Sequence, residues 1–167
     1  MKLTLLICIM VSLTFNNAQA QQCDLLELHC PYGSVGGTVT NEVRISVCGN
    51  PIDAIGVTIL FDEQDLEYAG VSFSGTLLEG WTSVNADLEA PGKLVIVGWD
   101  ITGFDTATQE PMAKINFNVV SSDYGYSEIT FDSNGLYDDV EGFLTINCSA
   151  PLPVKNMSWG KLKMLYR

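Results

Sequence analysis

The stretch that decides the fold is Ile55-Gly56-Val57-Thr58-Ile59-Leu60-Phe61, in which large apolar side chains recur at every second position. Side chains alternate between the two faces of a β-strand. One face of this segment therefore carries four large apolar residues, and the other carries glycine, threonine and leucine. Such a period of two predicts a strand with one buried face. The polar run Asp62-Glu63-Gln64-Asp65 predicts the turn that follows it.

The same alternation recurs on both sides of this segment, between turns rich in glycine, proline, asparagine and aspartate. No window shows a capped helical stripe. Nine strands are expected, at Leu26–Leu28, Val43–Val47, Ile55–Phe61, Leu66–Phe73, Trp81–Val84, Lys93–Trp99, Ile115–Val119, Ile129–Phe131 and Phe143–Ile146. The segment Lys93–Trp99 is apolar on both faces, which predicts a central place in a sheet. Many short strands in about 130 residues indicate an all-β protein, a sandwich of two sheets with about nine strands.

The first twenty residues have the features of a signal peptide. Lys2 is followed by a mostly apolar run, Leu3 to Leu13, and then by the small-x-small site Ala18-Gln19-Ala20. The apolar run is shorter than the roughly 20 residues of a membrane span, and no later segment is long enough either. We therefore expect a secreted or cell-surface protein with a signal peptide at 1–20 and one domain at 21–150. Residues 151–167 are expected to be a linker and basic tail, either a plain peptide or the truncated start of a further domain.

The charge of the chain excludes two classes of partner. Between residues 21 and 150 lie all twenty acidic residues but only three basic ones, Arg44, Lys93 and Lys114, a net charge of −17. Such a surface repels nucleic-acid phosphates and anionic membranes. Nucleic-acid binding and membrane insertion are therefore not expected, whereas a partner with a basic face is compatible with this charge.

Four cysteines follow the signal peptide: Cys23, Cys30, Cys48 and Cys148. An even number in an exported chain predicts two disulfides. A metal site is the alternative, but the chain has no Cys-x-x-Cys pair and one histidine, His29. The four cysteines allow three pairings.

The order of several short motifs is familiar. A glycine-marked loop leads into an alternating strand (36–47), and an apolar strand ends in aromatic-Asp shortly before Leu-Glu (55–67). A Gly-Lys-apolar strand (92–99), a Met-Ala-x-Ile-x-Phe-x-Val strand (112–119) and a Gly-x-x-x-Ile segment (125–129) follow. In this order and spacing they resemble the cohesin domain, over about Leu25 to Ile146.

The resemblance implies a jelly-roll sandwich whose first strand lies antiparallel to the second and parallel to the ninth. That arrangement implies the disulfides Cys23–Cys48 and Cys30–Cys148. It also implies a non-catalytic module that docks a dockerin, a calcium-loaded module of another secreted protein, so calcium is expected on the partner more than on this chain.

In cohesins one exposed sheet face binds the partner. The matching strands here are Ala54–Asp62, Trp81–Val84, Lys93–Trp99 and Tyr126–Phe131, and the expected face residues are Ala54, Gly56, Thr58, Leu60, Val95, Val97 and Glu128. The third strand of cohesins usually directs polar side chains at the partner, whereas here those positions hold alanine, glycine, threonine and leucine. A flatter, more apolar face around Leu60 and Val95 would suit a different protein partner.

Other chemistry has less support. No catalytic residue can be assigned, so an enzyme is not expected, and no cofactor is expected. Calcium is a hard cation that binds several oxygen ligands. Two acidic groups could hold it: a cluster of Asp132, Asn134, Asp138, Asp139 and Glu141, and a second group of Asp62, Glu63 and Asp65.

Two alternative functions remain open. The first is polysaccharide binding through exposed aromatic residues, for which Trp81, Tyr124 and Tyr126 are the candidates. The second is a structural unit of an extracellular adhesin.

Overall fold

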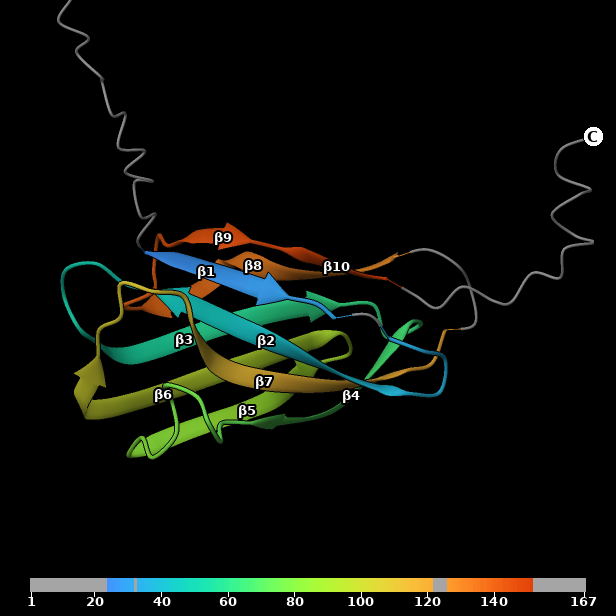
Figure 1. The fold of residues 1–167 in the computed structure, drawn as a ribbon, viewed down its shortest axis with the longest axis horizontal. Helices are drawn as coiled ribbons and strands as arrows, with labels where there is room; N and C mark the ends of the chain where they lie inside the picture. The colour runs from blue at the N-terminus through green and yellow to red at the C-terminus, as the bar shows by residue number, and fades with distance from the viewer. Residues whose placement is uncertain (1–23, 32, 122–125, 152–167) are drawn as a thin grey trace, which may run out of the picture.

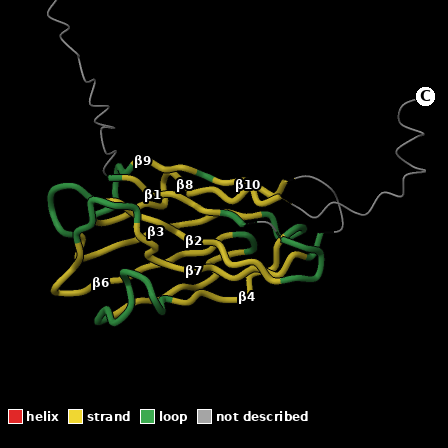
Figure 2. The backbone as a smooth tube through the Cα atoms, viewed as in Figure 1, coloured by secondary structure: helices red, strands yellow, loops and turns green. Residues whose placement is uncertain are grey.

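β3 (Ile52–Phe61) forms the middle strand of a five-stranded sheet, as its alternating apolar residues require. The computed structural model describes residues 24–31, 33–121 and 126–151, and within these ranges the protein consists of strands and loops (Figure 2). The other strands are β1 (Leu25–His29), β2 (Thr38–Ser46), β4 (Leu66–Ser72), β5 (Ser83–Ala90), β6 (Lys93–Phe104), β7 (Glu110–Val119), β8 (Tyr126–Asp138), β9 (Leu144–Ile146) and β10 (Cys148–Pro151).

The ten strands form two sheets that pack face to face (Figure 1). Sheet A has the order β4-β7-β2-β1-β9, and sheet B has the order β10-β8-β3-β6-β5. β1 pairs with β2 antiparallel and with β9 parallel. The predicted all-β, two-sheet sandwich is confirmed, and so is the predicted position of the first strand between the second and the ninth.

The core lies between the sheets and is built from the inward rows of both. Ile55, Val57 and Ile59 of β3 are each at most 1% exposed. They face apolar residues of sheet A, and the rings of Phe61 and Phe117 lie 4.8 Å apart across the layer. Burial of these rows is the main force that holds the sheets together.

The strands differ from the prediction mainly in extent. β10 is a tenth strand, which pairs with β8 beyond the expected end of the fold. β5 spans Ser83–Ala90, whereas the sequence predicted a strand at Trp81–Val84. The exposed residues of β5 include Asn85, Asp87 and Glu89. The alternation of apolar and polar residues continues beyond Val84 through Ala86 and Leu88, so the strand is longer than predicted.

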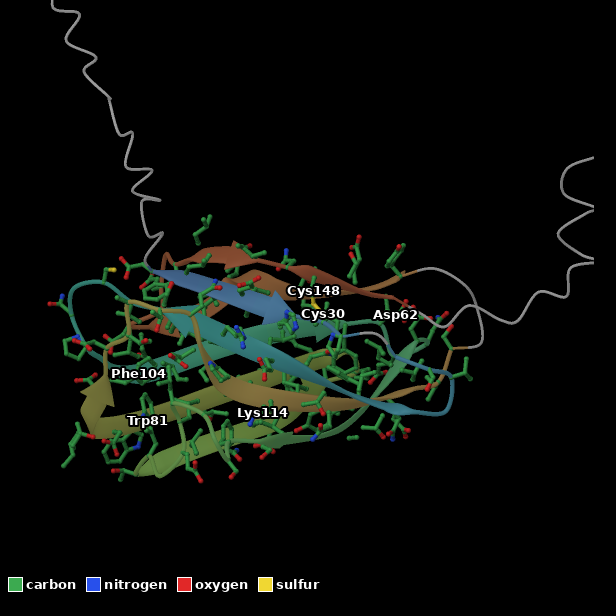
Figure 3. The ribbon with its side chains drawn as sticks, in the orientation of Figure 1. Cys30, Asp62, Trp81, Phe104, Lys114 and Cys148 are labelled. Carbon is green, nitrogen blue, oxygen red and sulfur yellow. A yellow bond between two sulfur atoms is a disulfide. The ribbon has the colours of Figure 1, made fainter. Side chains whose placement is uncertain are left out.

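A disulfide between Cys30 and Cys148, the second predicted pair, joins the end of β1 in sheet A to the start of β10 in sheet B (Figure 3). Their Cα atoms lie 5.9 Å apart. Cys48 is also disulfide-bonded. Cys23, its predicted partner, lies outside the described residues. In the part of the chain that the structure describes, no helix has the length and hydropathy of a membrane span.

β8 carries a large bulge. Ile59 pairs with Phe131, but Val57 pairs with Leu136, so the residues 132–135 lie opposite one residue of β3, Thr58. Inside the bulge the backbone N–H of Asn134 donates to Asp132 Oδ1 at 3.0 Å. The bulge and the strand beyond it shape the outer face of sheet B.

Candidate functional site

The outer face of sheet B is formed by β8, β3, β6 and β5, which lie side by side in that order. These strands include most of the four segments that the cohesin resemblance assigns to the partner-binding face; Asp62 follows β3, and Trp81 and Thr82 precede β5. The inward rows of these strands belong to the core, so the opposite rows face away from sheet A. We call this surface the outer face.

The outer row of β6 is unusually apolar for an exposed surface. Val97, Trp99 and Ile101 are 44%, 50% and 85% exposed, while Leu94, Ile96 and Asp100 between and beside them are buried. Both rows of the segment Lys93–Trp99 are apolar, but only one of them faces the core and the other lies open. Exposed contiguous apolar surface commonly marks an interaction site.

Gly56 of β3 allows an aromatic ring to cover the middle of the outer face. A Cβ atom at this position would lie 2.9 Å from Cδ2 and 3.0 Å from Cβ of Tyr137. Glycine therefore permits Tyr137, which pairs with Gly56 in the neighbouring strand, to lie close to β3 while half of its own surface remains exposed. Tyr137 and Trp99 thereby flank the small residues Ala54 and Gly56.

The expectation that Gly56 and Thr58 are available to a partner is wrong. Gly56 is buried near Tyr137, and Thr58 is 1% exposed. The bulge of β8 packs directly against Thr58, because a Cβ atom at Gly135 would lie only 2.4 Å from Thr58 Cβ. The other expected face residues are accessible: Ala54, Leu60 and Val95 are half-buried, and Val97 and Glu128 are exposed.

An acidic rim borders the apolar part of the outer face. A hollow of about 310 Å³ is lined by Thr58, Val95 and Tyr137 on one side and by Asp87 and Glu89 of β5 on the other. Lys93 Nζ lies 2.8 Å from Glu89 Oε2, and this hydrogen bond raises the pKa of the Lys93 ammonium. Asp87 retains an unneutralised charge at the edge of the hollow, since neither ion pair among the described residues includes it.

Asp100 fixes the geometry where β6 passes the start of β5. Its two carboxylate oxygens accept hydrogen bonds from the backbone N–H and hydroxyl of Thr82 and of Thr102. The hydrogen bonds from Thr102, followed by those from Thr82, hold the pKa of the Asp100 carboxyl far below its usual range. Trp99 pairs with Ala54 and Ser83, and the exposed Ile101 lies in the irregular stretch 100–103 of β6 that follows.

The aromatic residues predicted for glycan binding do not form one row. Trp81 is half-buried, not exposed, because its ring packs against Phe104 at a centroid distance of 5.6 Å. Tyr126 is 71% exposed and lines a groove with Asp62, and Figure 3 shows Trp81 and Asp62 at opposite ends of the sandwich. Tyr124 lies outside the described residues.

The residues considered for calcium have other roles in the structure. Asp139 Oδ2 accepts hydrogen bonds from the backbone N–H groups of Asp53 and Ala54 at 2.9 and 3.0 Å, which anchors the start of β3. Asp132 accepts the bond inside the β8 bulge, and Asp138 has a positive φ of 60°. Within residues 24–31, 33–121 and 126–151 no group of three or more His, Cys, Asp or Glu side chains is placed to hold a metal.

Sequence reasoning missed Trp99, Ile101 and Tyr137 on the outer face. A signal for the first two was present, because Val95, Val97, Trp99 and Ile101 continue one period of two opposite the row of Leu94 and Ile96. Tyr137 had no such signal, since the bulge interrupts the alternation of its strand.

Solved structures with the same architecture are cohesins. The sixth cohesin from scaffoldin B of Acetivibrio cellulolyticus, solved in complex with a Cel5 dockerin mutant, matches with a TM-score of 0.63 at 23% identity, over 77% of this chain and 97% of that chain. CaCohA2 from Clostridium acetobutylicum matches with a TM-score of 0.63 at 20% identity, over 80% and 92%. A non-cellulosomal cohesin from the archaeon Archaeoglobus fulgidus matches with a TM-score of 0.61 at 14% identity, over 86% and 97%.

The chain therefore has a cohesin-type fold. No family model and no curated protein matches its sequence.

Proposed function

We propose that this chain is a secreted, non-catalytic module that docks another extracellular protein, of the dockerin type, through the outer face of sheet B. The observation that carries the proposal is the exposed apolar row of β6, Val97, Trp99 and Ile101, beside the half-exposed ring of Tyr137. Several solved cohesins of this fold are in complex with dockerins.

The face has the anatomy of a protein interface. Interfaces have an apolar, aromatic centre and a polar rim. Here Trp99 and Tyr137 lie beside Ala54 and Gly56, and Asp87, Glu89 and Glu128 border them on the side toward Leu60. The centre is rigid, because β6 is hydrogen-bonded to a strand on each side. The hollow beside Tyr137, which Val95 and Asp87 also line, offers space for a side chain of the partner.

The face differs from one that binds through a row of polar side chains. Thr58, the one polar residue of the outer row of β3, is covered by the β8 bulge. We infer that binding energy comes mainly from apolar contacts on β6 and from Tyr137, with charge acting at the rim.

The test is a binding measurement with dockerin-type modules of the organism that makes this chain, with calcium and with a chelator. Trp99→Ala is expected to weaken the complex by about 2 kcal/mol, or about 30-fold in Kd, as for a tryptophan at the centre of an interface.

The matched control for this test is Leu144→Ala, because Leu144 is also 50% exposed but lies on β9 of sheet A. Equal weakening by both variants, or binding that neither variant affects, would place the partner elsewhere. Binding of a soluble polysaccharide that quenches tryptophan fluorescence, with no dockerin bound, would support the glycan alternative instead.

A further inference from the structure

A second surface, separate from the apolar row of β6, lies where the β3–β4 turn meets β8. It is a groove of about 730 Å³ whose lining includes apolar Leu60, Pro91 and Tyr126. The same groove is lined by four carboxylates, Asp62, Glu63, Asp65 and Glu128. A groove with this lining fits a ligand that is both apolar and basic.

The carboxylates of the groove lack cationic partners in the described part of the chain, where the ion pairs are Arg44–Glu42 and Lys93–Glu89. The third basic residue between 21 and 150 is Lys114, whose Nζ donates to the backbone carbonyl of Ser74 at 3.0 Å. None of these three cations lines the groove, and each is engaged with another group, so none of them forms an ion pair with its carboxylates.

The remaining cations after the signal peptide are all in the residues that follow β10. The segment 152–167, Leu-Pro-Val-Lys-Asn-Met-Ser-Trp-Gly-Lys-Leu-Lys-Met-Leu-Tyr-Arg, holds four basic residues and no acidic one. It also contains a tryptophan, a tyrosine, two methionines and three leucines. Its composition complements both the charge and the apolar part of the groove.

The last described strand, β10, ends beside the groove. Pro151, the last residue of β10, pairs with Tyr126, which lines the groove. An extended chain spans about 3.3 Å per residue, so Lys155 can lie about 13 Å from Pro151. Figures 1 and 3 show β10 and Asp62 near the same end of the sandwich.

We propose that the groove formed by Leu60, Asp62, Glu63, Asp65, Tyr126 and Glu128 binds the basic segment 152–167 of the same chain. The segment's lysines neutralise the carboxylates, and its aromatic and aliphatic side chains cover Leu60 and Tyr126. Because Leu60 and Glu128 belong to the outer face of sheet B, the bound segment occupies one end of that face. The proposal does not depend on the docking function.

The experiment is carbodiimide coupling on the full chain after signal-peptide removal, which joins a lysine amine directly to a carboxylate in contact with it. Mass spectrometry is expected to find Lys155, Lys161 or Lys163 coupled to groove carboxylates at least five times more often than to Glu110 or Glu141, which are exposed elsewhere. The preference is expected to fall in 1 M salt, where the Debye length shrinks from about 8 Å to about 3 Å.

The double variant Glu63→Gln, Asp65→Asn is expected to reduce coupling to the remaining groove residues Asp62 and Glu128 severalfold, whereas Glu110→Gln, Glu141→Gln leaves it unchanged. Coupling spread evenly over all exposed carboxylates would overturn the proposal, as would coupling that Glu63→Gln, Asp65→Asn does not alter. A mixture of isotope-labelled and unlabelled chains identifies the connection, and coupling found only between different chains would refute binding within one chain.

Discussion

Removal of the Cys30–Cys148 disulfide gives a direct test of how the two sheets are held together. The bridge connects residues 118 positions apart in the sequence and joins β1 of sheet A to β10 of sheet B. A disulfide restricts the unfolded chain in proportion to the logarithm of the loop that it closes. For a loop of this length the chain-entropy relation gives about 5 kcal/mol at 25 °C.

The double variant Cys30→Ala, Cys148→Ala is therefore expected to lose about 3–5 kcal/mol of unfolding free energy. Both cysteines pack against the core, so a small part of the loss is side-chain contact. The measurement is urea unfolding of wild type and variant, without added thiols, so that the remaining disulfide does not exchange. The urea m-value is expected to rise, because the unfolded variant exposes more surface than the bridged chain.

Serine in place of alanine is the control, since an effect on the unfolded chain predicts nearly the same loss for both pairs of substitutions. A loss of less than about 1 kcal/mol with an unchanged m-value would refute the reasoning. It would show that the pairing of β10 with β8 alone fixes this end of the chain.

Three further changes probe the outer face of sheet B. Gly135→Ala places a Cβ atom 2.4 Å from Thr58 Cβ and is expected to cost about 1–3 kcal/mol in urea unfolding; the exposed neighbour Ser133→Ala should cost almost nothing. Asp100→Asn is expected to lower the melting temperature at pH 7. Because the folded pKa of Asp100 lies below its unfolded value, the difference from wild type should shrink as the pH falls below about 4; a difference independent of pH would show that ionisation is irrelevant. Ile101→Thr, at a side chain that is 85% exposed, is expected to weaken partner binding and leave stability within about 0.5 kcal/mol.

Much of the fold could be predicted because the buried rows are regular. In β3 the residues at odd positions from Ile55 to Phe61 are all buried, as the period of two requires. β5 and the end of β8 could not be delimited in the same way. In the edge strand β5 the apolar residues Val84, Ala86 and Leu88 do alternate with polar ones, but the row includes small alanines and none of it is fully buried, so the pattern is weaker than in β3.

The residues predicted for the partner-binding face all lie on sheet B, but two of them, Gly56 and Thr58, are buried. Counting by two from Ile55 identifies the outward row of β3, yet it does not show whether another segment covers that row. The residues 132–135, Asp-Ser-Asn-Gly, have the composition of a turn. The strand was expected to end at Phe131, whereas residues 132–135 bulge over Thr58 and the strand continues to Tyr137 and Asp138.

The small residues of the outer row were nevertheless informative. Glycine is depleted in β-strands, because it has no side chain that can pack on the surface of the sheet. Gly56 is instead needed because Tyr137 approaches the backbone of β3, and Gly135 is needed because β8 approaches Thr58. Glycine at a solvent-facing strand position therefore indicates that something lies over it. On this face it indicates that Tyr137 covers β3, which leaves the row of Val97, Trp99 and Ile101 as the open apolar surface.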